Sequence, residues 1–555
     1  MNYNNEEFFS NVPTLHAHTS TFDRSFTHKM TMNCDYFYPI FIDELLPGDT
    51  VKLDFQAFGR LVNPLVCPIM DELYFETLWF KCPWRLLWDN TFAFFGEREN
   101  PDDSTDYVLP TITVPTAQYN TIFDHMGLNP LAGDKTVVSL PFRMYNLVYN
   151  TWLRNQNLIA SVDVPKGDSD DYLNYTLLKS HKVHDVFTSM LPSPQLGDAV
   201  QIPLGVSAPV IVNGSALGLT NGTVDNYLVQ SNSYGAFGYN SDDVSTLPHT
   251  ANTYNVFGQL DMLGVSTDPS KSGLKVDLST ATGIDVNDFR FLIKLQRYRE
   301  RLMLGGHRYR EIISQFFHVD QLDNRAYIPE FLGMTREMVD INNVIQTSAT
   351  DNVTPQGNIT AYGVVDHHGS GFTTSAVEHS YLLGLARFRH NPVYQQGTNK
   401  LWLHSTALDI YNPMFDGLGE QPVLQEEIVT HGDSAVDSDG NILDKKAVGF
   451  QEAWYNYRYY PSLITGQLRT GVPLSLDVYH LGQFYGTVTS QSTTQDEVIL
   501  NQSFIESDVP LDRVLSINTD EQQGIVQFVM DFRFNYIHTR VMPVHNIPAG
   551  LYEGI

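Results

Sequence analysis

The sequence is poor in cysteine and has no long hydrophobic run. Its three cysteines, Cys34, Cys67 and Cys82, form no ligand-spaced pair, and their odd number argues against a disulfide framework and against a structural zinc site. No stretch approaches the ~18 apolar residues of a membrane span, and the opening residues MNYNNEEFFS lack the apolar segment of a signal peptide. We therefore expect reduced thiols, no membrane insertion, and a protein that folds where it is made.

Basic residues are also scarce. Lys and Arg number 34 against 63 Asp and Glu, which gives a formal net charge of -29. Phosphate binding depends mainly on Lys and Arg, so an evenly spread charge of this sign would repel nucleic acid. The balance disfavours a general DNA-binding protein, and any contact with DNA must be local.

The common catalytic motifs are missing as well. The sequence contains no G-x-S-x-G elbow, no H-E-x-x-H and no phosphate-binding P-loop. Carboxylates are so abundant that some pair will face each other by chance, which makes a glycosidase easy to propose and hard to support. We expect no catalytic residue and no cofactor.

Possible metal ligands occur without the spacing that a metal site requires. The stretch HGDSAVDSDGNILD offers oxygen ligands of the type calcium prefers: Asp433, Asp437, Asp439, Asn441 and Asp444. Gly440 is the fourth position counted from Asp437, whereas an EF-hand loop needs glycine at the sixth, so a solvated turn is favoured. His367-His368 and the pair His16 and His18 lack a third ligand, and we expect surface or interface histidines and no metal.

What the sequence does contain is material for a large β-rich core. Hydrophobic residues make up 42% and aromatic residues 12%, while 38 Gly and 28 Pro interrupt the chain, which favours short strands and long loops. At 555 residues the chain exceeds the usual size of one core. It must form several domains or one domain with large insertions.

Two strands are predicted near opposite ends of the chain. VKLDFQAF, from Val51, alternates apolar and polar residues, and VQFVMDFRF, from Val526, does the same. Clear strands at both ends with irregular material between them predict an antiparallel sandwich whose terminal strands are neighbours and whose loops are expanded. The fold class is therefore mainly β.

Helical spacing is found in two places inside the expected insertions. Met144, Leu147, Val148 and Trp152 recur at helical spacing within residues 143–157. A second helix is predicted from about Asp288 to Leu304, where Gly305-Gly306 supplies the stop.

The composition changes between residues 198 and 284. This stretch has no Arg, only two Lys, and many Gly, Ser, Thr and Asn, which predicts an exposed insertion between an N-terminal part, 1–197, and a C-terminal part, 285–555. Recurring apolar residues indicate that the insertion packs, among them Tyr227, Tyr234, Phe237, Tyr239 and Tyr254.

Segments spread along nearly the whole chain resemble one viral family. They include TFDRSFTHKMT (21–31), PIFIDELLPGDT (39–50), LYFETLWFKCPWRLLWDN (73–90), LPFRMYNLVYNTWLRNQNL (140–158), HDVFTSMLPSPQLG (184–197), GHRYREII (306–313), LGEQPVLQEEI (418–428) and EAWYNYRYYPSLITGQLR (452–469). In this order they resemble the major capsid protein of gokushoviruses, a branch of the microviruses, which are small icosahedral single-stranded DNA bacteriophages.

The resemblance implies an eight-stranded antiparallel jelly roll with large loop insertions that contain short helices. It implies that sixty copies form a T=1 shell around circular single-stranded DNA, assembled in the host bacterial cytoplasm. The insertion 198–284 would form the protrusion at the three-fold axes that meets a host surface receptor, with the five aromatic residues above as contact candidates. It further implies a small basic DNA-binding protein, an internal scaffolding protein and a DNA-pilot protein as partners.

The most basic stretch, residues 289–310, is the candidate for local DNA contact. Its arginines suit phosphate and its tyrosines could stack on unpaired bases: Arg297, Arg299, Arg301, Arg308, Arg310, Tyr298 and Tyr309. The arginines could instead pair with carboxylates within or between subunits, and both interpretations stay open. The alternative to a capsid protein is a phage glycan-binding or glycan-cleaving β-rich protein, which would need an aromatic-lined cleft with two carboxylates at catalytic separation.

Overall fold

The computed structural model describes residues 18–197, 200, 286–306, 308–317, 327–348, 350, 356–489, 493–516 and 526–545, together with short strands between 210 and 276. The chain forms two compact units. One comprises Met1–Pro194 and Met303–Ile555, and the other comprises Gln195–Leu302.

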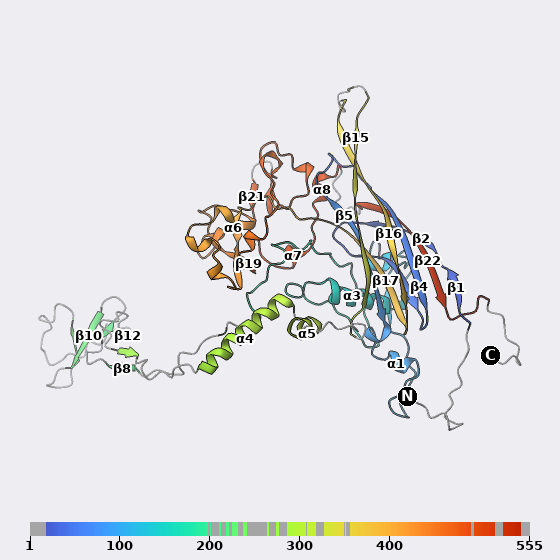
Figure 1. Ribbon diagram of the computed structural model, residues 1–555, viewed down its shortest axis with the longest axis horizontal. Helices are drawn as coiled ribbons and strands as arrows, with labels where there is room; N and C mark the ends of the chain where they lie inside the picture. The colour runs from blue at the N-terminus through green and yellow to red at the C-terminus, as the bar shows by residue number, and fades with distance from the viewer. Residues whose placement is uncertain are drawn as a thin grey trace. The chain divides into compact units, whose positions relative to one another are not determined.

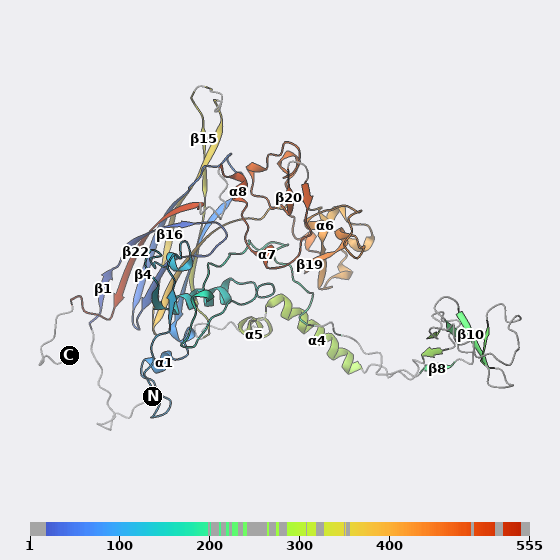
Figure 2. The same cartoon turned by 180° about the vertical axis from the view of Figure 1, so that it is seen from behind.

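Two antiparallel sheets dominate the first unit (Figure 1). The larger sheet has the order β1 (Ser20–Asp23), β22 (Phe528–Arg540), β4 (Thr50–Leu61), β16 (Ile359–Ser375), β15 (Asp340–Ile345), and β2 (Phe26–Met32) also pairs with β22. The smaller sheet has the order β14 (Glu330–Met338), β5 (Leu73–Pro83), β17 (Ser380–His390), β3 (Tyr38–Leu45). Figure 2 shows the same strands from behind.

The strand order is that of a jelly roll. The larger sheet contains the strand order β2-β22-β4-β16, and the smaller sheet has the order β3-β17-β5-β14. This distribution of eight strands over two sheets is that of a double Greek key. This confirms the predicted eight-stranded jelly roll, and β1 and β15 extend the larger sheet.

The two strands predicted from sequence lie side by side. β4 and β22 both alternate buried and outward residues, and they pair antiparallel with Phe55 opposite Phe534. The inward residues of both strands join one core between the sheets, where they meet Phe75, Trp79 and Phe388 of the smaller sheet. The prediction that strands near the chain ends are neighbours is confirmed, although β22 begins at Phe528 rather than at Val526.

The strands β5 and β17 of the smaller sheet are buried on both faces. β5 and β17 show almost no exposed position, because their outward residues pack in a second core with α3 (Leu140–Val148). Met144, Tyr145 and Val148 of this helix lie in that core. The covering segment belongs to the long connection 84–329 between β5 and β14, so a sheet face that would otherwise meet water is closed by an insertion.

Both predicted helices are present. α3 begins before the predicted range and passes into a π-helical turn, Tyr149–Leu153, whose Trp152 donates its indole N–H to the carbonyl of Pro329 at 2.9 Å. α4 (Val286–Gly305) ends as predicted, with Gly306 in the left-handed region at φ +91°. A short helix, α5 (Tyr309–Phe317), follows.

The remaining α-helices and strands of the first unit lie in the insertions. They are α1 (Thr91–Phe94), β6 (Thr111–Val114), α2 (Ile122–His125), β7 (Lys135–Val138), β18 (Glu420–Leu424), α6 (Gln425–Ile428), β19 (Ala447–Glu452), β20 (Gly486–Val488), β21 (Thr493–Gln495), α7 (Gln502–Ile505) and α8 (Leu511–Val514). A third core, around Phe187, Tyr394, Ile428 and Phe504, joins the connection 391–527 to residues 186–190 of the connection 84–329.

The second unit contains short strands. β11 (Phe237–Asn240), β10 (Asp225–Gln230), β9 (Gly218–Thr220) and β12 (Gly264–Val265) form one sheet, and β13 (Leu274–Val276) pairs with β8 (Val210–Val212). Most of the stretch 198–284 lies outside the described residues, so its predicted limits as a separate insertion stay a prediction.

Candidate assembly and nucleic-acid surfaces

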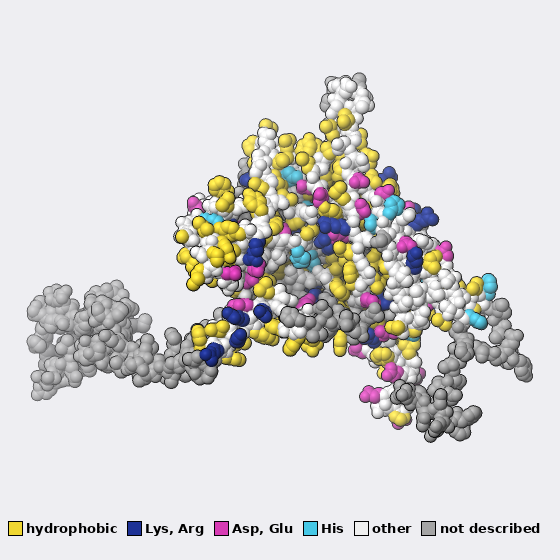
Figure 3. All heavy atoms as spheres, viewed as in Figure 1, with side chains coloured by type: hydrophobic (Ala, Val, Ile, Leu, Met, Phe, Trp, Pro, Cys, Tyr) yellow, Lys and Arg dark blue, Asp and Glu magenta, His cyan; other side chains and the backbone are white. Residues whose placement is uncertain are grey.

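The basic stretch forms a cationic stripe along α4. Arg290, Lys294, Arg297 and Arg301 follow one another at intervals of four, three and four residues, so they share one face of the helix, and all four are exposed. Figure 3 shows these Lys and Arg side chains gathered along the helix. Arg299 is two positions from both Arg297 and Arg301, and therefore lies on another face.

The candidates for DNA contact that follow α4 differ in their surroundings. Arg308 is half-buried: it donates to Glu311 at 3.0 Å and to the carbonyl of Asn150 at 3.2 Å. Tyr309 is exposed on α5, and the side chain of Arg310 lies outside the described residues. The structure therefore supplies a carboxylate partner for Arg308, as the alternative interpretation requires, and contact of these residues with DNA stays a prediction.

The five aromatic residues proposed for host contact cannot be placed as side chains. Tyr227 belongs to β10, and Phe237 and Tyr239 belong to β11, which pair antiparallel with Leu228 opposite Tyr239. Tyr234 and Tyr254 lie outside the described residues. Their proposed role stays a prediction.

An exposed apolar surface, which we call the apolar flank, lies in the connection 391–527. It is built on three single 3-10 turns, Lys400–Trp402, Ala407–Asp409 and Pro413–Phe415, and on the segment 457–463. Its members are exposed large apolar side chains: Leu401, Trp402, Leu408, Ile410, Met414, Leu418, Tyr457, Tyr460 and Leu463. Figure 3 shows hydrophobic side chains crowded over this part of the molecule, around α6 and β19.

The apolar flank is hollowed in two places. An open depression of about 580 Å³ is lined by the aromatic residues Tyr411, Trp454 and Tyr457, by Leu418, and by the carboxylates Asp416, Glu420 and Glu452 among others. A second, of about 250 Å³, is lined by Trp402, Tyr460 and Leu463. Such concave, aromatic-rich surfaces are typical of protein interfaces, where Trp, Tyr and Met are enriched.

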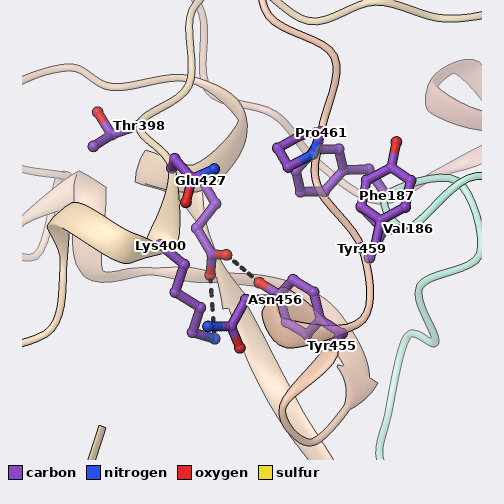
Figure 4. Close-up of a pocket in the computed structure, with 10 residues that line it drawn as sticks. Val186, Phe187, Thr398, Lys400, Glu427, Tyr455, Asn456, Tyr459 and Pro461 are labelled. Carbon is purple, nitrogen blue, oxygen red and sulfur yellow. Dashed lines mark hydrogen bonds and ion pairs between the residues drawn. The ribbon is translucent and has the colours of Figure 1, made fainter. Parts of the chain in front are cut away.

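A small cavity beneath the flank holds one buried carboxylate (Figure 4). Glu427 accepts hydrogen bonds from the Tyr455 hydroxyl and from the Leu424 backbone N–H, and Lys400 Nζ lies 3.8 Å from its Oε1. Burial raises the pKa of Tyr455 and lowers that of Lys400. The cavity measures about 20 Å³, room for a single water, and Glu427 is the one carboxylate among its described lining residues. This arrangement holds the connection together and does not provide the paired carboxylates of a glycosidase.

The acidic stretch 433–444 makes turns. Asp437 accepts from the backbone amides of Asp439 and Asn441, and buried Asp444 accepts from those of His431 and Gly432. Among the described residues no three Asp, Glu, His or Cys side chains gather as a metal site would require.

The expectation for the histidine pair was wrong in one half. His368 is exposed, but His367 is buried between the sheets, 5.1 Å from the ring of Phe55 and 6.0 Å from that of Phe75. Neighbouring residues of a strand point to opposite faces, so one histidine of the pair had to point inward once β16 paired with β4. His18 is exposed and His16 lies outside the described residues.

Several ionisable groups are buried where the insertions meet the sandwich. Burial lowers the pKa of His181 and of His125 to about 4 and that of His390 to about 3. Burial also raises the pKa of Asp35 to about 6, and its carboxylate accepts from the Val509 backbone N–H at 3.1 Å. These shifts predict that the stability of the junctions depends on pH.

The apolar flank cannot be recognised from the sequence, because its residues follow neither a helical nor a strand period.

Comparisons with known proteins agree with this architecture. The family model described as "Capsid protein (F protein)" matches residues 10–550. The chain is 38% identical to the capsid protein VP1 of Bdellovibrio phage phiMH2K, over 98% of both chains. It is 34% identical to capsid protein VP1 of Chlamydia phage 1, over 98% of this chain and 97% of the relative, and 31% identical to that of Spiroplasma virus 4, over 93% and 92%. In the described residues no helix has the length and apolarity to cross a membrane. A jelly roll with long insertions, matched over nearly its full length, therefore belongs to the phage capsid protein (F protein) family and is a structural protein of the virion.

Proposed function

We propose that sixty copies of this chain assemble, in the host bacterial cytoplasm, into a T=1 icosahedral shell around circular single-stranded DNA. The main support for self-assembly is the exposure of the apolar flank. Met414 is 85% exposed, Trp402 78% and Tyr460 71%, in a segment with no regular secondary structure of its own beyond single turns.

Exposure of this surface is unfavourable for an isolated subunit. Patches of this kind mark protein interaction sites, and each large side chain removed from water contributes about 1.5 to 3 kcal/mol. A shell of identical subunits covers such a patch by contacts that repeat with closed symmetry. The partner that fits the apolar flank is therefore a second copy of the chain.

Substitution of Met414 tests this assignment. Met414→Asp places a charge in the contact and should reduce the yield of closed particles at least tenfold, while the subunit keeps its melting temperature. Met414→Leu, which keeps the apolar character, should assemble like wild type. Normal particles from Met414→Asp, counted by negative-stain microscopy after sedimentation, would contradict a contact between copies at this surface.

The second unit is our candidate for the host-facing protrusion. Its stretch 198–284 has no Arg and is rich in small polar residues, and it sits within a connection rather than in the sandwich. Deletion from about Gly205 to Thr280 should leave the shell intact and impair infection of the host, which carries the surface receptor. Loss of soluble folding in the deletion variant would refute a separable insertion.

The cationic stripe on α4 is a candidate for contact with DNA. A shell of subunits with net charge -29 cannot neutralise its genome alone, so a small basic protein or bound cations should compensate the remaining phosphates. We also expect an internal scaffolding protein and a DNA-pilot protein as partners. Arg297→Glu should give particles that retain less genome if the stripe faces DNA, and should block assembly if Arg297 pairs with a neighbouring carboxylate. Normal assembly with normal genome content would exclude both roles.

A further inference from the structure

The outward face of the larger sheet is the one broad sheet surface that the insertions leave uncovered in the described part of the chain. The outward residues of β4 at positions 52, 56, 58 and 60 are exposed, as are Arg533 of β22 and His368 of β16. In the smaller sheet, by contrast, the outward residues of β5 and β17 are buried under the connection 84–329. The two faces of the sandwich therefore meet different surroundings.

Register places the outward side chains in rows across the four central strands. One row contains Thr27, Arg533, Gln56 and His368; the next contains Lys29, Asp531, Phe58 and Asp366; the third contains Thr31, Val529, Arg60 and Val364. Neighbouring strands lie about 4.8 Å apart, so Phe58 has Arg60 along its own strand and Arg533 on the diagonal. Phe58 is 53% exposed.

The charges on this face differ from those of the whole chain. On the four central strands four cations, Lys29, Lys52, Arg60 and Arg533, stand beside three carboxylates, Asp54, Asp366 and Asp531, whereas the chain has 34 cations to 63 carboxylates. The edge strands β1 and β15 add Asp23 and Asp340. The three carboxylates of the central strands already have neighbours. Lys29 pairs with Asp531, Lys52 lies 3.8 Å from Asp54, and His368 lies 3.4 Å from Asp366.

Arg60 and Arg533 remain available. Neither makes an ion pair or a side-chain hydrogen bond with any residue that the structure describes, and both stand at the surface on rigid, paired strands. Two free guanidinium groups beside an exposed aromatic ring form the arrangement by which proteins hold single-stranded nucleic acid without sequence preference, with phosphate on the arginines and a base on the ring.

Topology indicates the direction of this face. The connection that carries the proposed protrusion leaves from β5 and covers the outward face of β5 and β17 in the smaller sheet. If that side faces outward, the opposite, bare face of the sandwich faces the interior. We propose that this face, centred on Phe58, Arg60 and Arg533, lines the shell and contacts the single-stranded DNA. The inference rests on the proposed function, since it requires a shell that encloses DNA.

Salt dependence of DNA binding tests the proposal on purified full-length subunits. The double variant Arg60→Gln/Arg533→Gln should bind poly(dT) with a log–log salt slope smaller by about 1.4, because each phosphate contact on a single strand contributes about 0.7. Phe58→Ala should weaken binding about tenfold at fixed salt, as expected for loss of one stacked base. Lys445→Gln/Lys446→Gln, on the connection 391–527, removes the same charge elsewhere and should leave the slope unchanged.

Two results with subunits would overturn the proposal: an unchanged slope in the arginine double variant, or an equal change in the lysine control. Because these positions point outward, the variants should fold, and melting curves would verify that they do. If Phe58→Ala unfolds, the salt slope of the arginine double variant alone tests the proposal. A variant that binds DNA normally but no longer assembles would assign this face to protein contacts and reject the inference.

Particles from infected cells separate this proposal from the proposed function. Wild-type particles should contain single-stranded DNA, and the arginine double variant should retain less of it and release it at lower salt. DNA-free wild-type particles would overturn the proposed function itself. DNA-filled variant particles with wild-type salt sensitivity would overturn only the assignment of this face, and reduced retention in Arg297→Glu alone would move the contact to α4.

Discussion

Arg540 donates two hydrogen bonds to the carboxylate of Asp49, from Nε at 2.9 Å and from Nη2 at 2.7 Å, although 491 positions separate the two residues. His538 Nε2 lies 2.8 Å from the same carboxylate oxygen. Burial acts to raise the pKa of Asp49, but the hydrogen bonds from Arg540, the Leu46 backbone and His538 outweigh it and lower this pKa. The turn before β4 is thereby fixed to the end of β22.

Replacing Asp49 by Ala should loosen this attachment. The change removes the carboxylate shared by buried His538 and partly buried Arg540 and leaves Arg540 only the carbonyl of Glu44, at a cost of about 3 kcal/mol. Hydrogen exchange of the β22 amides should accelerate, and the melting temperature should fall. Asp54→Ala removes a partly exposed carboxylate from the same strand pair and should change neither; equal effects of the two substitutions would contradict the role of Asp49.

Gly384 of β17 should tolerate no side chain. A Cβ placed there would lie 2.5 Å from the indole of Trp79, whose ring is packed against Phe41, Phe55 and Phe372. Gly384→Ala should destabilise the sandwich by about 1 to 3 kcal/mol, because the indole can move only by displacing its neighbours. Gly133→Ala, where no atom lies within 4 Å of the new Cβ, is the control in thermal melts.

Acid should destabilise the subunit. Burial lowers the pKa values of His181, His125 and His390. Between pH 6.5 and about 4 these histidines are therefore protonated in the unfolded chain but stay neutral in the folded chain. Each histidine then costs on the order of 3 kcal/mol of stability as the pH falls through this range. Asp35 acts in the opposite sense, because its raised pKa gives stability that is lost as the pH rises through 6, and it offsets part of the effect.

Melting temperatures measured between pH 7.5 and pH 5 should therefore fall with pH, and His390→Gln should flatten the dependence. His368→Gln, at an exposed position of β16, is the matched control and should keep the wild-type dependence. Identical pH dependence in His390→Gln and wild type would show that this histidine does not contribute.

The hydroxyl of Tyr455 should stabilise the connection 391–527. Tyr455→Phe removes the donor to buried Glu427 and should cost about 1 to 3 kcal/mol locally. Faster proteolysis within residues 399–418 would report the loosening. Tyr460→Phe alters an exposed tyrosine of the same connection and should leave the proteolysis rate at the wild-type value.

The sequence pattern predicted those strands and helix ends that depend only on residues close in the sequence. β4 and β22 have one buried and one open face, so their alternation is visible in the sequence, and the Gly305-Gly306 stop of α4 depends only on neighbouring residues. The same alternation showed Lys52 and Gln56 as outward residues. Which side of the sandwich they face depends on the insertions, and no pattern within the strand contains that information.

Other features depend on long-range contacts. β5 is buried on both faces, so the sequence LYFETLWFKCP has no period to detect. The inward position of His367 follows from the register with β4, and the apolar flank rests on isolated turns held by Glu427 and Tyr455. The resemblance to a capsid family supplied the jelly roll, whereas these details required the tertiary structure.

The last strand to be synthesised, β22, lies inside the larger sheet and not at its edge. This strand lies between β2 and β4, so a ribosome making about 5 to 20 residues per second exposes two unpaired strand edges until the last part of the chain emerges. Contacts between such distant residues form slowly, and open edges promote aggregation. A chain terminated before Phe528 should therefore be insoluble, and the nascent protein should be a client of host chaperones until its final strand is inserted.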